Sequence, residues 1–354
     1  MGAFYLYHKE ANIQVDDVKH IFAQKGFSNP KIFDFGRWKL LLYRKVLLNV
    51  DNFYRENDQI ICCVGTLVYK GLGYRDSLKR LLQDFRAKAV CQEELLGHFC
   101  VIYWDGENLT LLTDQLNTFH IFTNENRTVL SSSFLAVLVG MPYRLSLNRI
   151  ALCEKLSTGY IISPDTLVEG IQKINDEIAS QFSYEKDGLA FLPHPPRPPV
   201  DLHQGGREES LNRQIEVLRV HFQKFDRLNS EFHGELGLSD GYDSRLLLAC
   251  SKFLSQKLSL HTHATKGVHD STRQLVEKMA QTLGLELRVV RTTRLEEWPG
   301  ERGDEILKDG LYFFDARCSY NMGALSEVYT RAYKTRVLGS KNRFSWNGLG
   351  GENL

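Results

Sequence analysis

A run of prolines most constrains how this chain can fold. Five of its nine prolines lie between residues 193 and 199. Proline fixes the backbone angle φ and has no N–H to donate, so the run fits neither a helix nor the middle of a sheet and favours an extended conformation. It would also suit a proline-binding domain of another protein, but a linker between two domains is the simpler interpretation. We therefore predict an N-terminal domain over residues 1–191, a linker over 192–200 and a C-terminal domain over 201–354.

The N-terminal domain is rich in expected strands. Short runs of apolar, β-branched and aromatic residues are separated by turn residues such as Asp105-Gly106. The expected strands are Trp38–Val46, Gln59–Tyr69, Phe99–Trp104, Leu109–Thr113 and Val129–Ser133. The segments Asp76–Phe85 and Leu147–Leu156 have the pattern of helices. Together these features predict an α+β domain that consists mostly of antiparallel sheet.

The hydrophobic period changes after the prolines. Over Glu208–Leu228, apolar residues four and three positions apart mark one face of an amphipathic helix. These residues are Leu211, Ile215, Leu218, Phe222 and Phe225. Beyond them, the expected strands Phe232–Leu238, Leu258–Ala264 and Leu285–Thr292 alternate with helices over Arg245–Leu254 and from the capping residue Asp270 to Leu283. Strands that alternate with helices predict an α/β domain with a parallel, doubly wound sheet.

The composition excludes several classes of protein. Lys and Arg number 44 and Asp and Glu 43, and the resulting net charge of +1 gives no long-range attraction to nucleic acid or to an anionic membrane. No stretch of about 20 apolar residues occurs, and the N-terminus lacks the pattern of a secretory signal. The seven cysteines are odd in number and form no CxxC pair. We expect a cytoplasmic protein with reduced thiols that binds neither nucleic acid nor membrane.

One short segment carries most of the chemical information. An expected strand ends at Leu238, and a helix starts near Asp243. Between them, Ser239, Gly241 and Ser244 offer small side chains and hydroxyl donors at a strand-to-helix turn. Backbone N–H groups and the positive helix end converge at such a turn, and phosphate is the natural guest. Asp243 would repel bare phosphate, so it points to a Mg²⁺ ion shared with a nucleotide.

A plainer interpretation fits the same segment. Ser239, Asp240, Asp243 and Ser244 are residues that cap a helix by accepting its free N–H groups. The segment alone does not decide between a phosphate loop and a capped helix. It is not a Walker loop, because GxxxxGK[ST] occurs nowhere in the chain.

The segment Ser239–Ser244 resembles the Ser-Gly-Gly-x-Asp-Ser loop of the ATP pyrophosphatase superfamily, with Asp240 in place of the first glycine. Those enzymes cleave ATP to AMP and pyrophosphate while they adenylate a substrate. The resemblance implies that Leu238, Ser239, Gly241, Asp243 and Ser244 bind ATP and pyrophosphate and that Asp243 also binds the metal ion.

Other segments narrow the resemblance to asparagine synthetases and β-lactam synthetases. Leu96–Asp105 is similar to the Gly-x-Phe-x-x-x-x-x-Asp strand pair of their N-terminal domain, and Thr113–Phe122 to a stretch that follows, with Ser131–Ser133 at the expected distance. Leu156–Ile174 resembles their connector. Asn347–Asn353 resembles the second phosphate and metal loop, which implies that Gly348 and Gly350 bind phosphate and Glu352 the metal. These motifs occur in the family order over residues 96–353.

The resemblance implies a glutaminase-like sandwich followed by an ATP pyrophosphatase-type domain. Glutamine-dependent members attack glutamine with an N-terminal cysteine. Here Gly2 follows Met1, and Val64-Gly65-Thr66 stands where an oxyanion-binding Asn-Gly pair belongs, so we expect no glutamine hydrolysis. β-Lactam synthetases also lack this nucleophile. The sandwich would then support the fold or bind a partner.

The implied reaction is ATP-dependent amide formation with Mg²⁺. A carboxylate, from a small molecule or a peptide, attacks ATP and releases pyrophosphate, and ammonia or another amine then displaces AMP. No catalytic residue is assigned, and a homodimer is compatible with the family. The family continues beyond the second loop, whereas this chain ends at Leu354. The alternative is therefore a truncated or degenerate relative that binds nucleotide or acts as a scaffold.

Two further hypotheses are disfavoured. A tRNA-modifying pyrophosphatase would share the first loop but predicts a basic face, which the net charge of +1 does not support. A zinc site is suggested by His261 and His263, which share one face of an expected strand. No third ligand is evident from the sequence, so zinc is not predicted.

Overall fold

The structure is a computed structural model that describes residues 2–44, 50–114, 118–161, 164–174, 181–185, 188–192, 206–265, 271–292, 301–316 and 344–346. The expected linker lies outside these ranges apart from residue 192, so the domain boundaries stay a prediction. None of the helices in the described ranges has the length and apolar character needed to cross a membrane.

The N-terminal half contains two antiparallel sheets. The order in the first is β10-β8-β9-β1-β3-β2 and in the second β12-β11-β7-β6-β5-β4. The first sheet comprises β1 (Ala3–His8), β2 (Lys31–Phe35), β3 (Trp38–Tyr43), β8 (Phe122–Asn124), β9 (Val129–Ser131) and β10 (Ile171–Lys173). The second comprises β4 (Phe53–Glu56), β5 (Gln59–Tyr69), β6 (Leu95–Trp104), β7 (Leu109–Thr113), β11 (Gln181–Glu185) and β12 (Gly188–Leu192). The sequence therefore predicted the character of this half correctly.

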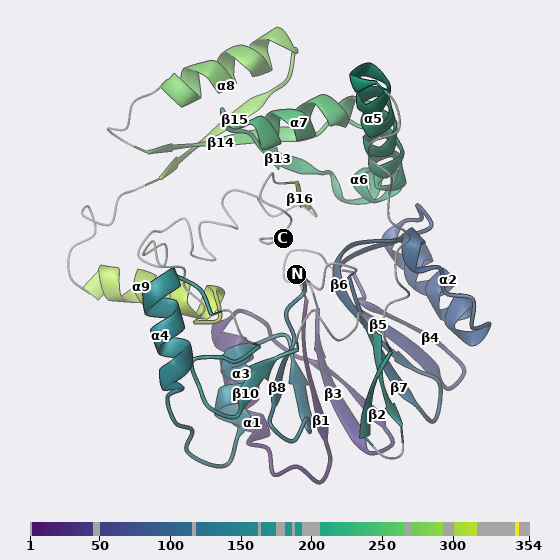
Figure 1. Ribbon diagram of the computed structural model, residues 1–354, viewed down its shortest axis with the longest axis vertical. Helices are drawn as coiled ribbons and strands as arrows, with labels where there is room; N and C mark the ends of the chain where they lie inside the picture. The colour runs from purple at the N-terminus through teal and green to yellow at the C-terminus, as the bar shows by residue number, and fades with distance from the viewer. Residues whose placement is uncertain are drawn as a thin grey trace.

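The side chains of the strands point alternately to the two faces of each sheet, and this explains how the sheets and helices are layered. In β1, Phe4 and Leu6 pack into the core between the two sheets, whereas Tyr5 and Tyr7 pack under the helices on the outer face. Successive side chains of a strand point to opposite faces, so a strand that is apolar throughout is buried on both sides. The helices α1 (Val15–Gln24) and α3 (Phe134–Gly140) cover the first sheet, and α2 (Tyr74–Arg86) covers the second. The layers run helix, sheet, sheet, helix (Figure 1), and α4 (Arg149–Thr158) follows α3 along the chain.

The C-terminal half contains a parallel sheet in the order β15-β14-β13-β16. Its elements are α5 (Arg207–Lys224), α6 (Asp226–Phe232), β13 (Glu235–Gly237), α7 (Tyr242–Cys250), β14 (Ser259–Thr265), α8 (Ser271–Thr282), β15 (Leu287–Thr292), α9 (Glu301–Phe313) and β16 (Ser345–Trp346). The sheet and most of its helices lie above the sandwich in Figure 1. The alternation of strands and helices in parallel order is confirmed, and the kinship with ATP pyrophosphatases stays a prediction.

Two expectations for this half are wrong. The single helix over Glu208–Leu228 is instead two helices, and the strand expected from Phe232 begins at Glu235 because Phe232 still belongs to α6. The Asp226 carboxylate accepts the N–H of Ser255 over 2.7 Å, which anchors the start of α6. His233 then ends α6 in a left-handed conformation with φ of 49°. Apolar residues on both sides of the break, Phe222, Leu228 and Phe232, pack into one core.

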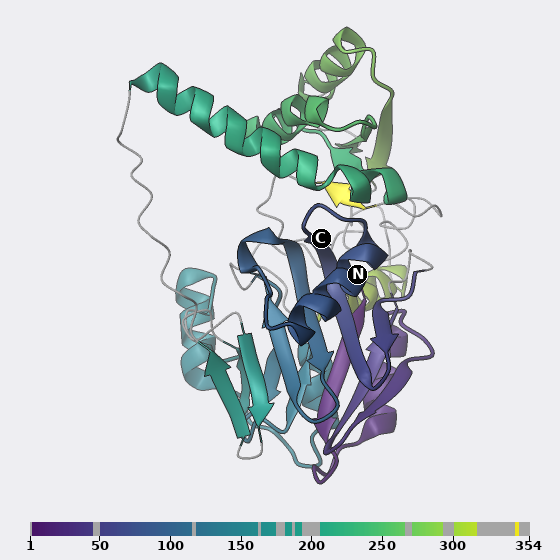
Figure 2. The ribbon, with the colours of Figure 1, turned by 90° about the vertical axis from the view of Figure 1, so that its right-hand side faces the viewer.

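The N-terminal part of α5 also departs from expectation. Leu211 and Ile215 are 54% and 44% exposed, whereas Phe222 is 3% exposed. Figure 2 shows α5 extending sideways beyond the sandwich, so only its C-terminal part packs against the protein. An amphipathic pattern predicts the face of a helix but not how far a neighbouring element covers that face.

The two halves share one apolar core. Phe222 stacks on Trp346 of β16 with ring centroids 4.9 Å apart. Phe232 of α6 meets Tyr74 of α2 edge-on at 6.3 Å. The carboxylate of Glu231 accepts the N–H of Tyr74 over 2.9 Å and so caps the first turn of α2. The parallel sheet is therefore held against the outer helix of the sandwich.

A buried carboxylate makes a second connection. Asp315, which follows α9 and is 4% exposed, accepts hydrogen bonds from the Ser133 hydroxyl and the N–H of Phe134 at the start of α3. Its Oδ1 also lies 2.6 Å from Nζ of Lys25, at the end of α1. A helix N-terminus stabilises negative charge. α9 thus attaches to the N-terminal half, although the strands before and after it belong to the parallel sheet.

We expect Asp315→Ala to destabilise the protein by about 3–5 kcal/mol, because it removes the buried carboxylate that accepts the N–H of Phe134 and the Ser133 hydroxyl and pairs with Lys25. Urea unfolding measures this loss. Asp304→Ala, on the exposed side of the same helix, is the matched control and should change stability by less than about 0.5 kcal/mol. The double change of Lys25→Met with Asp315→Leu should recover part of the loss. Equal stability of the Asp315 and Asp304 variants would show that the buried pair does not hold α9.

Candidate functional site

The loop expected to bind phosphate lies at the carboxyl edge of the parallel sheet. Residues 238–241 join the end of β13 to the start of α7. Leu236 of β13 lies opposite Trp346 of β16, and the N–H of Leu238 donates to the carbonyl of His261 in β14 over 2.8 Å. The loop therefore follows the end of β13, between β16 on one side and β14, which continues to Thr265, on the other. Sheets of this kind bind ligands at that edge.

The serine hydroxyls hold the loop together. Oγ of Ser239 lies 3.0 Å from Oγ of Ser244 and accepts the N–H of Gly241 over 3.2 Å. Oγ of Ser244 accepts the N–H of Ser239 over 3.1 Å and lies within 3.2 Å of the carbonyl oxygens of Ser239 and Gly241. Ser244 is 5% exposed. These bonds lie within the loop and none is made to an N–H of α7, so the side-chain capping of the capped-helix interpretation is not seen here, and the loop has one defined conformation.

The remaining expected residues divide between surface and interior. Leu238 is buried, whereas Ser239, Gly241 and Asp243 are exposed. Asp243 lies in the first turn of α7, and Gly241 caps that helix without a side-chain hydrogen bond. The Asp243 carboxylate is thus open to solvent beside the first N–H groups of the helix. Carboxylate oxygen is the ligand that Mg²⁺ prefers, so this residue fits a metal ion shared with a phosphate.

The second expected loop lies outside the described residues. This applies to Gly348, Gly350 and Glu352, so their roles stay predictions. Trp346, the last described residue before them, lies at the carboxyl end of β16 beside β13.

Two residues at the loop were not assigned a firm role from the sequence. Tyr242, directly after Gly241, is 84% exposed. The guanidinium carbon of Arg245 lies 4.4 Å from the centre of its ring. A cation over an aromatic face is attracted by the ring's electron density. In the sequence, an aromatic residue directly after Gly241 and an arginine three positions later could have suggested this contact.

A buried charge cluster beneath the loop was also missed. Glu235, at the start of β13, is fully buried. Its Oε1 lies 3.2 Å from Nδ1 of His261 and contacts the guanidinium of Arg288 in β15. Gly237 leaves room for the imidazole, because a Cβ there would stand 3.3 Å from Nε2 of His261. The cluster ties together the three strands β13, β14 and β15. Charged residues inside three apolar strands were the signal that could have revealed it.

The charge state of Glu235 follows from these contacts. Burial by itself raises the pKa of a carboxyl group. Hydrogen bonds from His261 and Arg288 outweigh burial and lower the pKa of Glu235 to about 2. Glu235 is therefore an anion that contacts the His261 imidazole and the Arg288 guanidinium. His261 uses its Nδ1 in this cluster, while its neighbour His263 meets it edge-on with ring centroids 5.2 Å apart.

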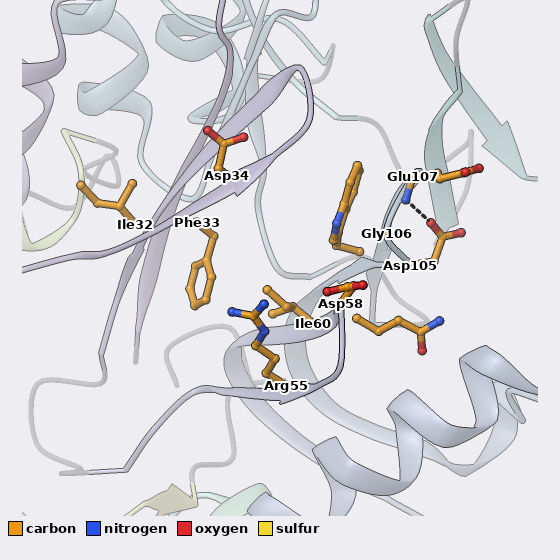
Figure 3. Close-up of a pocket in the computed structure, with 11 residues that line it drawn as sticks. Ile32, Phe33, Asp34, Arg55, Asp58, Ile60, Asp105, Gly106 and Glu107 are labelled. Atoms are coloured by element: carbon orange, nitrogen blue, oxygen red, sulfur yellow. Dashed lines mark hydrogen bonds between the residues drawn. The ribbon is translucent and has the colours of Figure 1, made fainter.

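A pocket of about 840 Å³ lies elsewhere, at the open edge of the sandwich between β2 and β4 (Figure 3). Two of its acidic residues have partners: Asp34 binds Lys9 over 2.6 Å, and Asp105 accepts the N–H of Glu107 over 2.8 Å. None of the described loop residues 238–244 lines this pocket. It is therefore separate from the expected nucleotide site.

Position 2, where the sequence resemblance predicts the site of a lost nucleophile, has no room for a side chain. A Cβ on Gly2 would stand 2.8 Å from the carbonyl oxygen of Tyr43 and 3.1 Å from Nδ2 of Asn52. Asn52 itself is 1% exposed and donates to that carbonyl over 3.0 Å. Gly65, in the segment where the oxyanion-binding pair belongs, lies within β5 opposite Phe99. The described residues at this end of the sandwich thus leave no space for a cysteine side chain.

Comparisons with known proteins do not assign a family. Neither the family models nor the curated proteins include a match to this sequence. Two solved structures resemble the fold distantly. One, described as the allosteric regulatory enzyme of purine biosynthesis, has a TM-score of 0.33 and 8% identity over 82% of this chain and 80% of its own. The other, glutamine phosphoribosylpyrophosphate amidotransferase from B. subtilis with ADP and GMP, has a TM-score of 0.31 and 9% identity over 82% of this chain and 81% of its own. Similarity at this level carries no functional argument.

We expect the Glu235 cluster to make the free energy of unfolding depend on pH in the acidic range. The pKa of Glu235 is about 2 in the folded protein, against a usual value of 4.5. Its contribution is therefore complete above about pH 4.5 and disappears as the pH falls towards 2; the shift corresponds to about 3 kcal/mol. In urea unfolding, Glu235→Gln should be less stable than the wild type by about that amount near pH 6 and by less near pH 3. Glu286→Gln, on an exposed residue before β15, serves as control. A gap that does not change with pH would contradict the assignment.

Proposed function

We propose that this chain is an ATP-dependent amide-forming ligase. Its parallel-sheet half adenylates a carboxylate with release of pyrophosphate, and an amine then displaces AMP to form the amide. The observation that carries this proposal is the loop 238–241 between β13 and α7, where β13 ends between the neighbouring strands β14 and β16. The resemblance of Ser239–Ser244 to the ATP pyrophosphatase loop supports the choice of ATP.

The residues of the loop have distinct roles in this proposal. Backbone N–H groups at the start of α7 and the hydroxyl of Ser239 bind the pyrophosphate part of ATP. Ser244 holds the loop in shape through its bonds to Ser239 and Gly241. Asp243 binds Mg²⁺, which offsets charge on the phosphates. The proposal extends this role to Glu352 and the phosphate-binding role to Gly348 and Gly350.

A second candidate is a nucleotide-binding or scaffold protein without turnover. The bonds between Ser239 and Ser244 favour it, because both hydroxyls already have partners within the loop. In that case the loop would cap α7 and the chemistry of the motif would be lost. The proposed function differs from this alternative in one measurable respect, the formation of pyrophosphate from ATP.

The sandwich half does not supply the amine in this proposal. The crowding at Gly2 and the place of Gly65 within β5 support a domain that does not hydrolyse glutamine. The amine then comes from solution, as ammonia or as an amino group of a second substrate. The contacts of α2 with α6 give the sandwich a role in supporting the parallel sheet.

We expect the purified chain to exchange labelled pyrophosphate into ATP in the presence of Mg²⁺ and the correct carboxylate. Aspartate, glutamate and pooled carboxylic acids are screened. Asp243→Asn should lower the exchange rate at least about tenfold, because it removes the anionic metal ligand. Asp76→Asn is the matched control, since Asp76 also lies in the first turn of an exposed helix, α2.

The outcomes separate the two candidates. Exchange that depends on a carboxylate and on Asp243 supports the ligase. Binding of Mg·ATP without exchange under any acid overturns the ligase and leaves the nucleotide-binding relative. Absence of Mg·ATP binding by a folded chain overturns both.

We also expect Gly2→Cys to create no glutaminase activity and to lower the free energy of unfolding by about 1–3 kcal/mol, because the new side chain meets the Tyr43 carbonyl in a packed core. Ammonia release from glutamine and urea unfolding measure the two effects. Gly206→Cys is the control, because a Cβ there meets nothing within 4 Å. Glutamine hydrolysis by the Gly2 variant would show that only the nucleophile is missing.

A further inference from the structure

The open edge of the sandwich has an arginine at a position where its sheet is otherwise apolar. The register of the second sheet places Arg55 of β4 opposite Ile60 of β5, and Ile60 opposite Trp104 of β6. Ile60 and Trp104 pack on the core between the two sheets, so Arg55 lies on the same, inward face. Because β4 is the last strand of its sheet, this cation stands at the mouth of the sandwich. Figure 3 shows Arg55 and Phe33 of β2 pointing toward one another across that mouth.

The space at this mouth has the size of a ligand pocket. Its volume of about 840 Å³ lies within the range of about 300–1,000 Å³ that is typical of small-molecule sites. Phe33, Ile60 and Trp104 form its apolar wall. Phe35 stacks on Trp104 with ring centroids 5.4 Å apart and so holds the indole in place. The wall can therefore cover the apolar part of a ligand.

Three charged side chains of this pocket can still bind a ligand. Nε of Arg55 donates to the carbonyl of Asn57 over 3.0 Å, which orients the guanidinium. No residue in the described ranges binds its two terminal nitrogens. In the same part of the chain, the carboxylates of Asp58 and Glu107 have neither a hydrogen bond nor an ion pair. The pocket thus offers one cation and two anions beside an apolar wall.

We propose that this pocket binds a free α-amino acid with a large apolar side chain. The guanidinium of Arg55 binds the carboxylate through two parallel hydrogen bonds, a geometry that arginine favours. Asp58 binds the ammonium group, and the aromatic wall covers the side chain. A simple anion would be repelled by the two carboxylates and a simple cation by the guanidinium, so a ligand that carries both charges fits best. The site is separate from the loop 238–241 and does not depend on the ligase activity.

Arg55 also has a simpler explanation at this place. Inward-pointing charges on edge strands prevent the sheets of two molecules from pairing. That role needs only the charge of Arg55, and it predicts that no amino acid binds. Binding measurements therefore separate the two explanations.

Calorimetric titration of the full chain with L-phenylalanine and L-leucine tests the proposal. Phenethylamine and 3-phenylpropanoate are the matched ligands, because each lacks one of the two charged groups of phenylalanine. Phenylalanine should bind, and each analogue should bind about 10- to 100-fold more weakly, the range for a lost hydrogen bond to a charged group.

Substitutions in the pocket assign each contact. Arg55→Gln should weaken phenylalanine binding by a similar factor and remove its advantage over phenethylamine. Asp58→Asn should instead narrow the difference between phenylalanine and 3-phenylpropanoate. Arg75→Gln and Asp76→Asn, at exposed residues of α2 outside the pocket, are the matched controls and should bind like the wild type.

Two results would overturn the proposal. Phenylalanine binding that Arg55→Gln does not weaken would place the amino acid elsewhere on the protein. No binding of phenylalanine or leucine by the folded wild type would leave Arg55 as a protection of the open edge. Either result leaves the proposed ligase standing, because that activity is measured separately by pyrophosphate exchange.

Discussion

Two carboxylates from the C-terminal half cap helices of the N-terminal half, and the arrangement of the molecule depends on them. Glu231 accepts the first N–H of α2, and Asp315 accepts those of α3. A helix leaves its first N–H groups without internal partners, so each carboxylate removes an unsatisfied donor and binds the positive helix end. Gly73 makes the first contact possible, since a Cβ there would overlap Glu231. The two caps attach the parallel-sheet half to opposite outer faces of the sandwich.

This attachment determines where the loop at residues 238–241 lies. The apolar core shared by the halves contains Phe232 and Trp346, and β13 ends at the loop. Beneath it, the Glu235 carboxylate is an anion that contacts His261 of β14 and Arg288 of β15. Such a buried contact has a strict geometry, because a displacement leaves the buried carboxylate without its partners. Apolar packing thus places the strand, and the ion cluster fixes its register against β14 and β15.

The sequence predicted the elements whose pattern is local. β5 has the bounds expected for Gln59–Tyr69, because it is apolar throughout and bounded by turn residues. The helix break at Phe225 was missed, because the apolar spacing continues across it and only the contact of Asp226 with Ser255 reveals it. The loop residues 238–244 were recognised from their order alone. The Glu235 cluster and the Asp315 cap were not, because their partners lie 26 to 290 positions away in the chain and no local pattern records such a pairing.

The close contacts around Gly2 show how the N-terminal half is packed at the position where a nucleophile was considered. A sandwich that had merely lost its nucleophile would keep an open position where the side chain used to be. Here the Tyr43 carbonyl and the buried Asn52 amide occupy that position and bind each other. A buried amide is stable only when its hydrogen bonds are made, so this pair resists the return of a side chain. The sandwich is therefore packed at this end of β1, and its described contacts with the other half are made through the helices α2 and α3 that the other half caps.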